Sequence, residues 1–300
     1  NMISRNNITE NTRDYVGIWV YSSSNNQIVE NTITTSSPSF TGGDAIALEY
    51  ASYNEIIENN ITAGGEGCGI SLYSSSNNTL SKNRIDGTHG ISISKSSSNT
   101  VIGNKIESFY YCILLYDSLS NIFYHNSIGP SWYQVYCYNS TSTWDDDYPS
   151  GGNFWSDYNG TDSYGGPYQN VTGSDGIGDT KYLINILNKD NYPLMIPWTL
   201  GPHVNLTVRT FGIGEIKGVE TWIDNYQPTF CTPMGMRLDV GSHAIKVRYG
   251  FLEPGPEEEL YIKYTFMCWE DLSTNNTRTI LLEEEKTIIA FYKWKIINLW

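Results

Sequence analysis

The stretch NEIIENNITAGGEGCGISLYSSSNNTLSKNRI, residues 54–85, begins and ends with the same phrase, N-x-Φ-x-x-N-x-Φ, in which Φ is apolar. Successive copies of the phrase start 25, 28, 24, 21 and 22 residues apart in this 300-residue chain. The six copies are NMISRNNI (1–8), NQIVENTI (26–33), NEIIENNI (54–61), NTLSKNRI (78–85), NTVIGNKI (99–106) and NIFYHNSI (121–128). A period of about twenty to thirty residues indicates a solenoid, in which each repeat is one coil that buries its apolar side against its neighbours.

A second alternating run lies between the phrases. It reads GIWV (17–20), AIAL (45–48), GISL (69–72), GISI (90–93), CILL (112–115) and QVYC (134–137). Alternation with a period of two predicts short strands, and stacking of equal positions gives two inward columns. One column is Ile18, Ile46, Ile70, Ile91, Ile113 and Val135, and the other is Val20, Leu48, Leu72, Ile93, Leu115 and Cys137. Residues 1–144 are therefore predicted to form an all-β, right-handed parallel β-helix of about six coils, with three short strands in each.

The asparagines of the phrase form two further columns. Asn tolerates the left-handed backbone region at turns, and stacked Asn side chains can pass hydrogen bonds from coil to coil. The columns are Asn26, Asn54, Asn78, Asn99 and Asn121, and Asn6, Asn31, Asn59, Asn83, Asn104 and Asn126. The unequal steps place longer loops at residues 36–43 and 64–67, where binding is expected because loops carry function.

Composition narrows the class of protein. The net charge is −14 and the pI is near 4.6, which repels nucleic acid and anionic lipid, so neither is expected as a partner. No window of 18 apolar residues occurs, so no membrane span is predicted. Low Lys content, high Tyr content and eight N-x-S/T sequons favour a secreted or cell-surface protein, with an upstream segment processed or left out. The sequons start at Asn7, Asn60, Asn77, Asn139, Asn159, Asn170, Asn205 and Asn275.

The repeats and the block that follows them resemble a known family. The repeat pattern is similar to the right-handed β-helices of the carbohydrate-binding and sugar-hydrolase (CASH) group. The segments GNFWSDYNGTD (152–162), SDGIGDTKYLI (174–184) and DNYPLM (190–195) resemble the block that closes the repeats of archaeal and bacterial NosD-like proteins, which implies an archaeal or bacterial source. The resemblance implies a β-helix, and it leaves the function open, because this scaffold serves lyases, hydrolases, metallocentre accessory proteins and noncatalytic surface proteins.

Residues 145–198 are rich in Gly and Asp and are predicted to cap the β-helix. Carboxylates spaced among glycines suit Ca²⁺, which takes six to eight oxygen ligands, and the candidate ligands are Asp157, Asp162, Asp175 and Asp179. The alternative is a cap built from Asx turns with no ion. Copper is less expected because Met and His clusters are missing, and no organic cofactor is predicted.

Residues 199–300 read as a series of strands separated by turns and are predicted to form a β-sandwich. The segments GVETWIDN (218–225), DVGSHAIKV (239–247) and YTFMCWEDLSTNNTRTILL (264–282) resemble Ig-like or PEGA-like modules of surface proteins. Such modules contain no active-site motif. Cys231 and Cys268 fall in different strands and are a candidate disulfide, with two free buried thiols as the alternative.

Aromatic residues occupy outward positions of the predicted coils. They are Trp19, Tyr21, Tyr73, Tyr116, Tyr136 and Tyr138. An aromatic strip stacks on sugars or packs in subunit interfaces, although the β-propensity of these residues alone also accounts for them. The expected function is that of a noncatalytic extracellular protein, either structural (sheath, surface-layer or filament subunit) or carbohydrate-binding. Self-association and glycans are the expected partners.

A polysaccharide lyase or glycoside hydrolase is the alternative function. Cleavage of a glycosidic bond needs two carboxylates at a set separation. Asp86 and Glu107 follow equivalent Ile positions on adjacent coils, about 5 Å apart, and are the candidate catalytic pair. The ordinary interpretation is two solvated carboxylates at a turn, and we therefore predict that the protein is not an enzyme.

Overall fold

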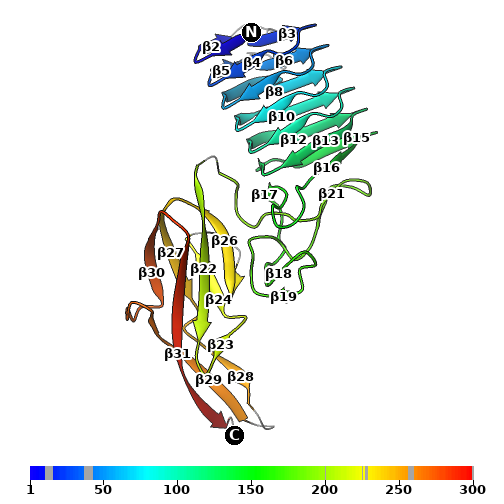
Figure 1. The fold of residues 1–300 in the computed structure, drawn as a ribbon. Coiled ribbons are helices and arrows are strands. Elements are labelled where there is room, and N and C mark those ends of the chain that lie inside the picture. The colour runs from blue at the N-terminus through cyan, green and yellow to red at the C-terminus, as the bar shows by residue number, and fades with distance from the viewer. Residues whose placement is uncertain are drawn as a thin grey trace. The chain divides into compact units, whose positions relative to one another are not determined.

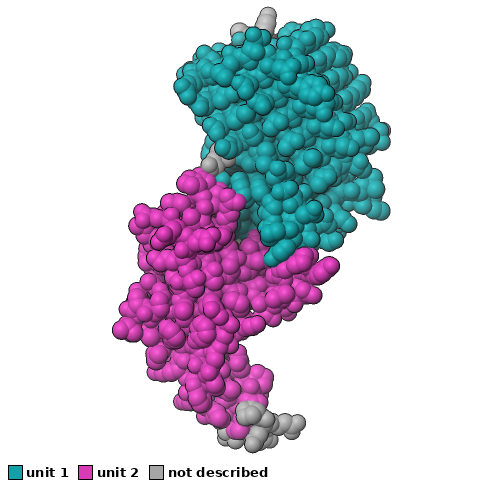
Figure 2. Space-filling view, viewed as in Figure 1, with its two compact units in different colours: residues 1–159, 180–200 teal, residues 160–179, 201–300 magenta. Residues whose placement is uncertain are grey.

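The computed structural model describes residues 1–10, 16–36, 43–199, 201–224, 226, 229–255 and 260–298. All regular elements in these ranges are strands. Most of the loop expected at residues 36–43 lies outside them. The chain divides into two compact units, shown in Figure 2: residues 1–159 with 180–200, and residues 160–179 with 201–300. The segment 145–198, expected as one cap, is thus shared between the two units. No helix of the described ranges is long and apolar enough to cross a membrane.

The first unit is a stack of β-coils (Figure 1). One parallel sheet takes one strand from each coil, in the order β1 (Met2–Ser4), β4 (Gln27–Val29), β7 (Glu55–Ile57), β9 (Thr79–Ser81), β11 (Thr100–Ile102), β13 (Leu119–Tyr124) and β16 (Thr141–Thr143). The second has the order β2 (Asn7–Glu10), β5 (Thr32–Thr35), β8 (Asn60–Tyr73), β10 (Arg84–Ser94), β12 (Lys105–Tyr116), β14 (Ser127–Ile128) and β17 (Phe154–Trp155). Beside this second series lie β3 (Ile18–Tyr21), β6 (Ile46–Glu49) and β15 (Tyr133–Tyr138). The parallel β-helix is confirmed.

Each coil has three faces. In the early coils three separate strands form them, as predicted. In the middle coils β8, β10 and β12 are each long enough to form two faces, and a register shift between Gly87 and His89 marks the corner in β10. The third face consists of β3, β6, β15 and the second halves of β8, β10 and β12.

The inward columns hold the coils together. Ile46, Ile70, Ile91 and Ile113 are in register and fully buried, as the sequence predicted. Burying an Ile side chain contributes about 1.5–3 kcal/mol, and every coil repeats the contribution. The apolar columns therefore stabilise the stack at every coil.

The asparagine columns are hydrogen-bonded ladders, as predicted. Asn59 donates both its backbone N–H and its Nδ2–H to Asn83 Oδ1, each at 3.0 Å, and Asn83 does the same to Asn104 at 2.9 and 3.0 Å. Nδ2 of Asn59 also donates to the carbonyl of Ile57 at 3.0 Å. A buried amide is costly unless it is hydrogen-bonded, and here every polar atom is used.

The left-handed residue of each corner is not the ladder asparagine itself. Glu58 and Lys82, which precede Asn59 and Asn83, have φ values of 56° and 55°. The expectation that the ladder asparagines themselves take this conformation is wrong. The preceding residue turns the chain, and the asparagine then fixes the turn through its side chain.

Two tryptophans cover the last coil. Trp144 stacks on Phe123, and Trp155 stacks on Tyr182 of β20 (Tyr182–Leu183), with ring centroids 4.3 and 4.1 Å apart. Asp190 of β21 (Lys189–Asp190) accepts hydrogen bonds from Trp155 Nε1 at 2.9 Å and from the backbone N–H of residue 153 at 2.7 Å. Its burial raises the pKa of this carboxyl to about 7. This end of the apolar column is thus closed by aromatic rings and one buried acid.

The second unit contains two larger sheets. The first has the order β23 (Glu215–Ile216), β22 (His203–Phe211), β31 (Lys286–Asn298), β29 (Leu260–Trp269) and β28 (Gly250–Pro254), and β26 (Met234–Asp239) also pairs with β22. The second has the order β25 (Phe230–Cys231), β24 (Glu220–Ile223), β27 (Gly241–Val247) and β30 (Thr277–Leu282). A small hairpin of β18 (Tyr164–Gly165) and β19 (Val171–Thr172) belongs to the same unit. The Ig-like or PEGA-like class of this unit stays a prediction.

The candidate disulfide is not formed. Cys231 and Cys268 are both free and belong to different sheets. Cys268 is buried in β29, whereas Cys231 Sγ lies 3.9 Å from Ser163 Oγ. Sequence placed the two cysteines correctly in separate strands, but it could not show which way each side chain points.

Candidate functional site

The third face of the β-helix presents two outward rows. In register, one row contains Trp19 and Tyr136, and the other contains Tyr21, Tyr73, Tyr116 and Tyr138. All six predicted aromatics are exposed. The structure therefore confirms their placement on one face, although the rings do not form one unbroken strip.

A first aromatic group lies on the early coils and consists of Trp19, Tyr21, Tyr50 and Tyr73. Neighbouring rings meet edge to face, with centroids 5.4 to 5.9 Å apart. Lys95 places Nζ 5.3 Å from the ring centroid of Tyr73 and 3.2 Å from its hydroxyl oxygen. This group ends at Lys95.

A second and larger group, which we call the aromatic surface, lies on β10, β12, β15 and the corners that precede them. Neighbouring rings of this group are 4.9 to 6.3 Å apart, the range in which aromatic pairs attract one another. Its members are His89, Phe109, Tyr110, Tyr111, Tyr116, Trp132, Tyr133, Tyr136 and Tyr138.

Sequence reasoning missed the corner residues of the aromatic surface. Phe109 and Trp132 are 55% and 65% exposed, and their ring centroids are 5.2 Å apart. The backbone N–H of Trp132 donates to the carbonyl of Phe109, which fixes one corner on the next. The sequence does contain a feature that could have predicted these residues. The aromatic runs FYY (109–111) and SWY (131–133) end at equivalent positions before the third-face strands. Large exposed rings gathered on a rigid sheet are typical of a binding surface.

Acidic side chains lie beside His89 at the edge of the aromatic surface. Asp44 accepts hydrogen bonds from the backbone N–H of Cys68 at 2.8 Å and from the hydroxyl of Ser71. Burial lowers the pKa of His89, and the negative charges of Glu66 and Asp44 oppose that shift in part. Nδ1 of His89 is buried and has no hydrogen-bond partner among the described residues.

Asp86 and Glu107 are neighbours in register on β10 and β12, as predicted. Glu107, however, lies in an ion pair with Lys105 at 2.9 Å and within 3.7 Å of Arg84. Charge-assisted contacts hold this carboxylate toward two cations. The sequence thus predicted that Asp86 and Glu107 lie close together, but it did not predict that Lys105 and Arg84 contact Glu107.

The four candidate calcium ligands do not form one cluster. Asp157 belongs to the first unit, where it accepts the hydroxyl of Tyr182 at 3.0 Å. Asp162, Asp175 and Asp179 belong to the second unit and accept N–H groups of their own loop. The donors are Gly176 N at 2.8 Å, Gly166 N at 3.0 Å and Ser163 N at 3.0 Å, respectively. Among the described residues no group of three or more His, Cys, Asp or Glu side chains is arranged to hold a metal. Calcium stays a prediction.

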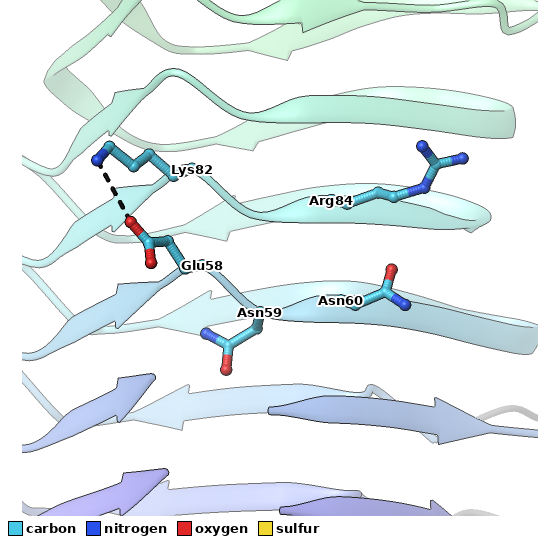
Figure 3. A pocket seen from close by; sticks show the side chains of 5 residues that line it. All are labelled: Glu58, Asn59, Asn60, Lys82 and Arg84. Carbon is cyan, nitrogen blue, oxygen red and sulfur yellow. Dashed lines mark hydrogen bonds and ion pairs between the residues drawn. The ribbon is translucent and has the colours of Figure 1, made fainter. Parts of the chain in front are cut away.

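A pocket of about 520 Å³ lies on other faces of the coils, lined by Glu58, Asn59, Asn60, Lys82 and Arg84. Figure 3 shows Lys82 and Glu58 reaching toward each other, and their charged atoms are 3.3 Å apart. Asn59 is already committed to its ladder. The pocket has few groups left for a ligand, and the aromatic surface is the better candidate site.

All eight sequon asparagines are exposed, which glycosylation requires. Glycosylation itself stays a prediction.

Comparison with known proteins supports the fold. Residues 37–160 match the family model described as "Periplasmic copper-binding protein (NosD)". No curated protein matches the chain.

Similar solved structures include a mutant of the periplasmic alginate epimerase AlgG, at 16% identity and a TM-score of 0.27, with 47% of this chain and 39% of that chain covered. They also include the full-length tailspike protein 2 of an Escherichia coli O157:H7 bacteriophage, at 11% identity and a TM-score of 0.34, with 94% of this chain covered. This chain spans about half of that tailspike, 51% of its length. The enzymatically active domain of the tailspike gives the same identity and TM-score, with 57% of its length covered. The coil geometry and the family match over residues 37–160 show that the N-terminal part of this chain is a parallel β-helix similar to NosD.

Proposed function

We propose that this is a noncatalytic protein of the cell surface or periplasm that binds a carbohydrate chain on the aromatic surface. The observation that carries the proposal is the continuous set of rings on β10, β12, β15 and the corner at Trp132, all of them exposed except the half-buried His89 and Tyr111. Aromatic rings supply contact area at a small cost in conformational entropy, and Tyr hydroxyls hydrogen-bond polar ligands. A solenoid holds the rings at fixed separations, so little ordering is needed on binding.

Two further observations support the proposal. The matching family is described as periplasmic, which agrees with the low content of charged residues, 17%, and with the exposed sequons. The carboxylate pair that cleavage would need includes Glu107, whose oxygens are directed at Lys105 and Arg84. A polysaccharide lyase or glycoside hydrolase is the alternative, and the binding experiment below includes its test.

The experiment is a binding screen of the purified chain against uncharged and acidic polysaccharides by affinity electrophoresis and calorimetry. Trp132→Ala and Phe109→Ala should each weaken binding at least about tenfold, because exposed rings of this kind act as anchors. Tyr168→Ala is the matched control, since Tyr168 is 84% exposed and lies in the other unit. Equal losses in all three variants, or no binding by the wild type, would overturn the proposal. Release of reducing ends or unsaturated products would establish an enzyme instead.

A structural role through self-association is the second candidate. It is favoured by two exposed apolar side chains of the second unit, Trp294 and Ile296. They are two residues apart on β31 and therefore point to the same face of its sheet. Exposed apolar surface of this kind marks interaction sites.

A further inference from the structure

His89 is built into the aromatic surface as one of its rings. Its imidazole stacks with Tyr110 and Tyr111, with centroids 6.0 and 5.8 Å apart and planes inclined by 28° and 18°. It follows the corner of β10 and is in register with Cys68 and Tyr111 on the adjacent coils. A ligand that lies on the Tyr rings therefore meets the imidazole as well.

The two nitrogens of His89 have different surroundings. Nδ1 is buried and has no hydrogen-bond partner among the described residues. Nε2 also makes no hydrogen bond to them, but it is not buried. Orphaned buried N–H groups are rarer in proteins than acceptors left unpaired, so the proton belongs on Nε2 in the neutral ring. Burial, which lowers the pKa of His89, keeps the ring neutral near pH 7. The open side of the ring then carries a hydrogen-bond donor.

The charge around the ring is negative. Glu66 and Asp44 interact electrostatically with His89, and Glu66 is exposed. Farther along the same face Lys95 is engaged by the ring and hydroxyl of Tyr73. A ligand carboxylate placed on these rings would approach two acids, and like charges brought together at an interface are strongly unfavourable.

We propose that His89 is a specificity-determining residue of the aromatic surface, donating a hydrogen bond from Nε2 to a hydroxyl of an uncharged sugar while Glu66 and Asp44 exclude sugars that carry carboxylates. This inference rests on the proposed carbohydrate-binding function and adds its substrate class. A site built to hydrogen-bond a hydroxyl discriminates more sharply than stacking alone, because its polar group is left unpaired with the wrong ligand.

The test compares uncharged polysaccharides (β-glucan, galactomannan, xylan and dextran) with uronates (alginate and polygalacturonate) as probes. The wild type should bind at least one uncharged probe and no uronate. His89→Phe keeps a stacked ring and removes the donor, so affinity for the uncharged probe should fall about fivefold to tenfold. Glu66→Gln should increase retention by uronates. A nitrogen-15 spectrum of the wild type at pH 7 should show His89 protonated at Nε2.

The outcomes separate the two proposals. Binding lost in Trp132→Ala but unaltered in affinity and selectivity by His89→Phe and Glu66→Gln would overturn this inference and leave the aromatic surface as the binding site. Preference of the wild type for uronates, or a proton on Nδ1, would have the same effect. A wild type that binds no probe would overturn both.

Discussion

At the scale of single residues, each ladder asparagine uses both halves of its amide. Asn83 is fully buried, its Oδ1 accepts two hydrogen bonds from Asn59, and its Nδ2 donates to the carbonyl of Ile56 at 2.8 Å and to Asn104 at 3.0 Å. No other side chain of similar size has an acceptor and a two-proton donor in this arrangement. The ladders are therefore sensitive to substitutions that barely change volume.

Asn83→Asp should destabilise the β-helix by about 2–4 kcal/mol, because it removes two donated hydrogen bonds and buries a carboxylate beside two acceptor oxygens. Chemical denaturation followed by circular dichroism would measure the shift of the β-helix transition. Asn60→Asp is the matched control, since Asn60 is exposed on a neighbouring coil and should change stability by less than about 0.5 kcal/mol. Equal shifts in both variants would show that the ladder contributes little.

Asp162 should make the second unit less stable as pH rises, whereas most carboxyl groups of folded proteins have the opposite effect. Burial, first of all, raises the pKa of its carboxyl to about 8, above the ordinary value of 3.8. Between these pH values the folded chain binds more protons than the unfolded chain, so this group's contribution to stability falls as pH rises from about 4 to 8. The melting temperature of the wild type minus that of Asp162→Asn should therefore decrease from pH 5 to pH 8. An increase over that range would contradict the shift.

At the scale of elements, the inward column of the third face joins the coils into one cooperative stack. Ile91 is fully buried between Ile70 and Ile113 in register, whereas the next residue, Ser92, points outward. Because each coil is stabilised mainly by its neighbours, damage to one layer weakens the layers on both sides.

Ile91→Asp should abolish the cooperative unfolding transition of the β-helix or lower its midpoint strongly, since an unpaired carboxylate in an apolar column costs several kcal/mol. Differential scanning calorimetry measures the effect. Ser92→Asp provides the same charge one residue away on the outer side and should melt close to the wild type. A midpoint for Ile91→Asp that matches the control would rule out the inward column as the core.

The Asp-rich segments provide a separate test of calcium. Calcium bound by Asp157, Asp162, Asp175 or Asp179 would stabilise the folded chain by mass action, so removal with a chelator should lower the melting temperature and calcium should restore it. Elemental analysis of the purified protein supplies the second measurement. If the purified protein is metal-free and its melting temperature does not respond to the chelator, Asp157 keeps the Tyr182 hydroxyl as its partner and Asp162, Asp175 and Asp179 keep their backbone N–H donors.

The repeat made most of the first unit predictable. Asn83 recurs at a fixed place in the phrase, and Ile70 and Ile91 recur at a fixed place in the run between phrases, so one correct alignment fixed the ladders and the columns together. Phe109 and Trp132 were not predicted because they lie in corners of unequal length, outside the phrase. The sequence also did not predict that Glu107 contacts two cations or that the Asp carboxylates accept backbone N–H groups, because these contacts depend on side-chain direction and not on sequence spacing.

At the scale of the whole molecule, apolar side chains are exposed in both units. The aromatic surface belongs to the first, and Trp294 and Ile296, which are 48% and 52% exposed, belong to the second. Isolated exposed apolar residues are ordinary on soluble proteins, whereas grouped ones mark contacts with partners.

We expect the chain to self-associate through the second unit. Light scattering over a range of concentrations should show species larger than the 33.8 kDa monomer. Trp294→Ser with Ile296→Ser should return the protein to the monomer without loss of polysaccharide binding. Trp132→Ser is the matched control and should leave association unchanged. A monomer at every concentration would refute the self-association, and monomer formation by Trp132→Ser alone would move the contact to the aromatic surface.

The one-way donation along the asparagine ladders has a consequence for how such a chain can change its length. In each ladder an inner coil offers one amide oxygen to the coil before it and takes one from the coil after it, so all inner coils make the same contacts at their two sides. A duplicated coil could be spliced in, or one removed, without a new kind of contact anywhere, while the tryptophan-closed end stays as it is. The number of coils can therefore change by duplication or loss of a single repeat, and the length of the β-helix changes with it.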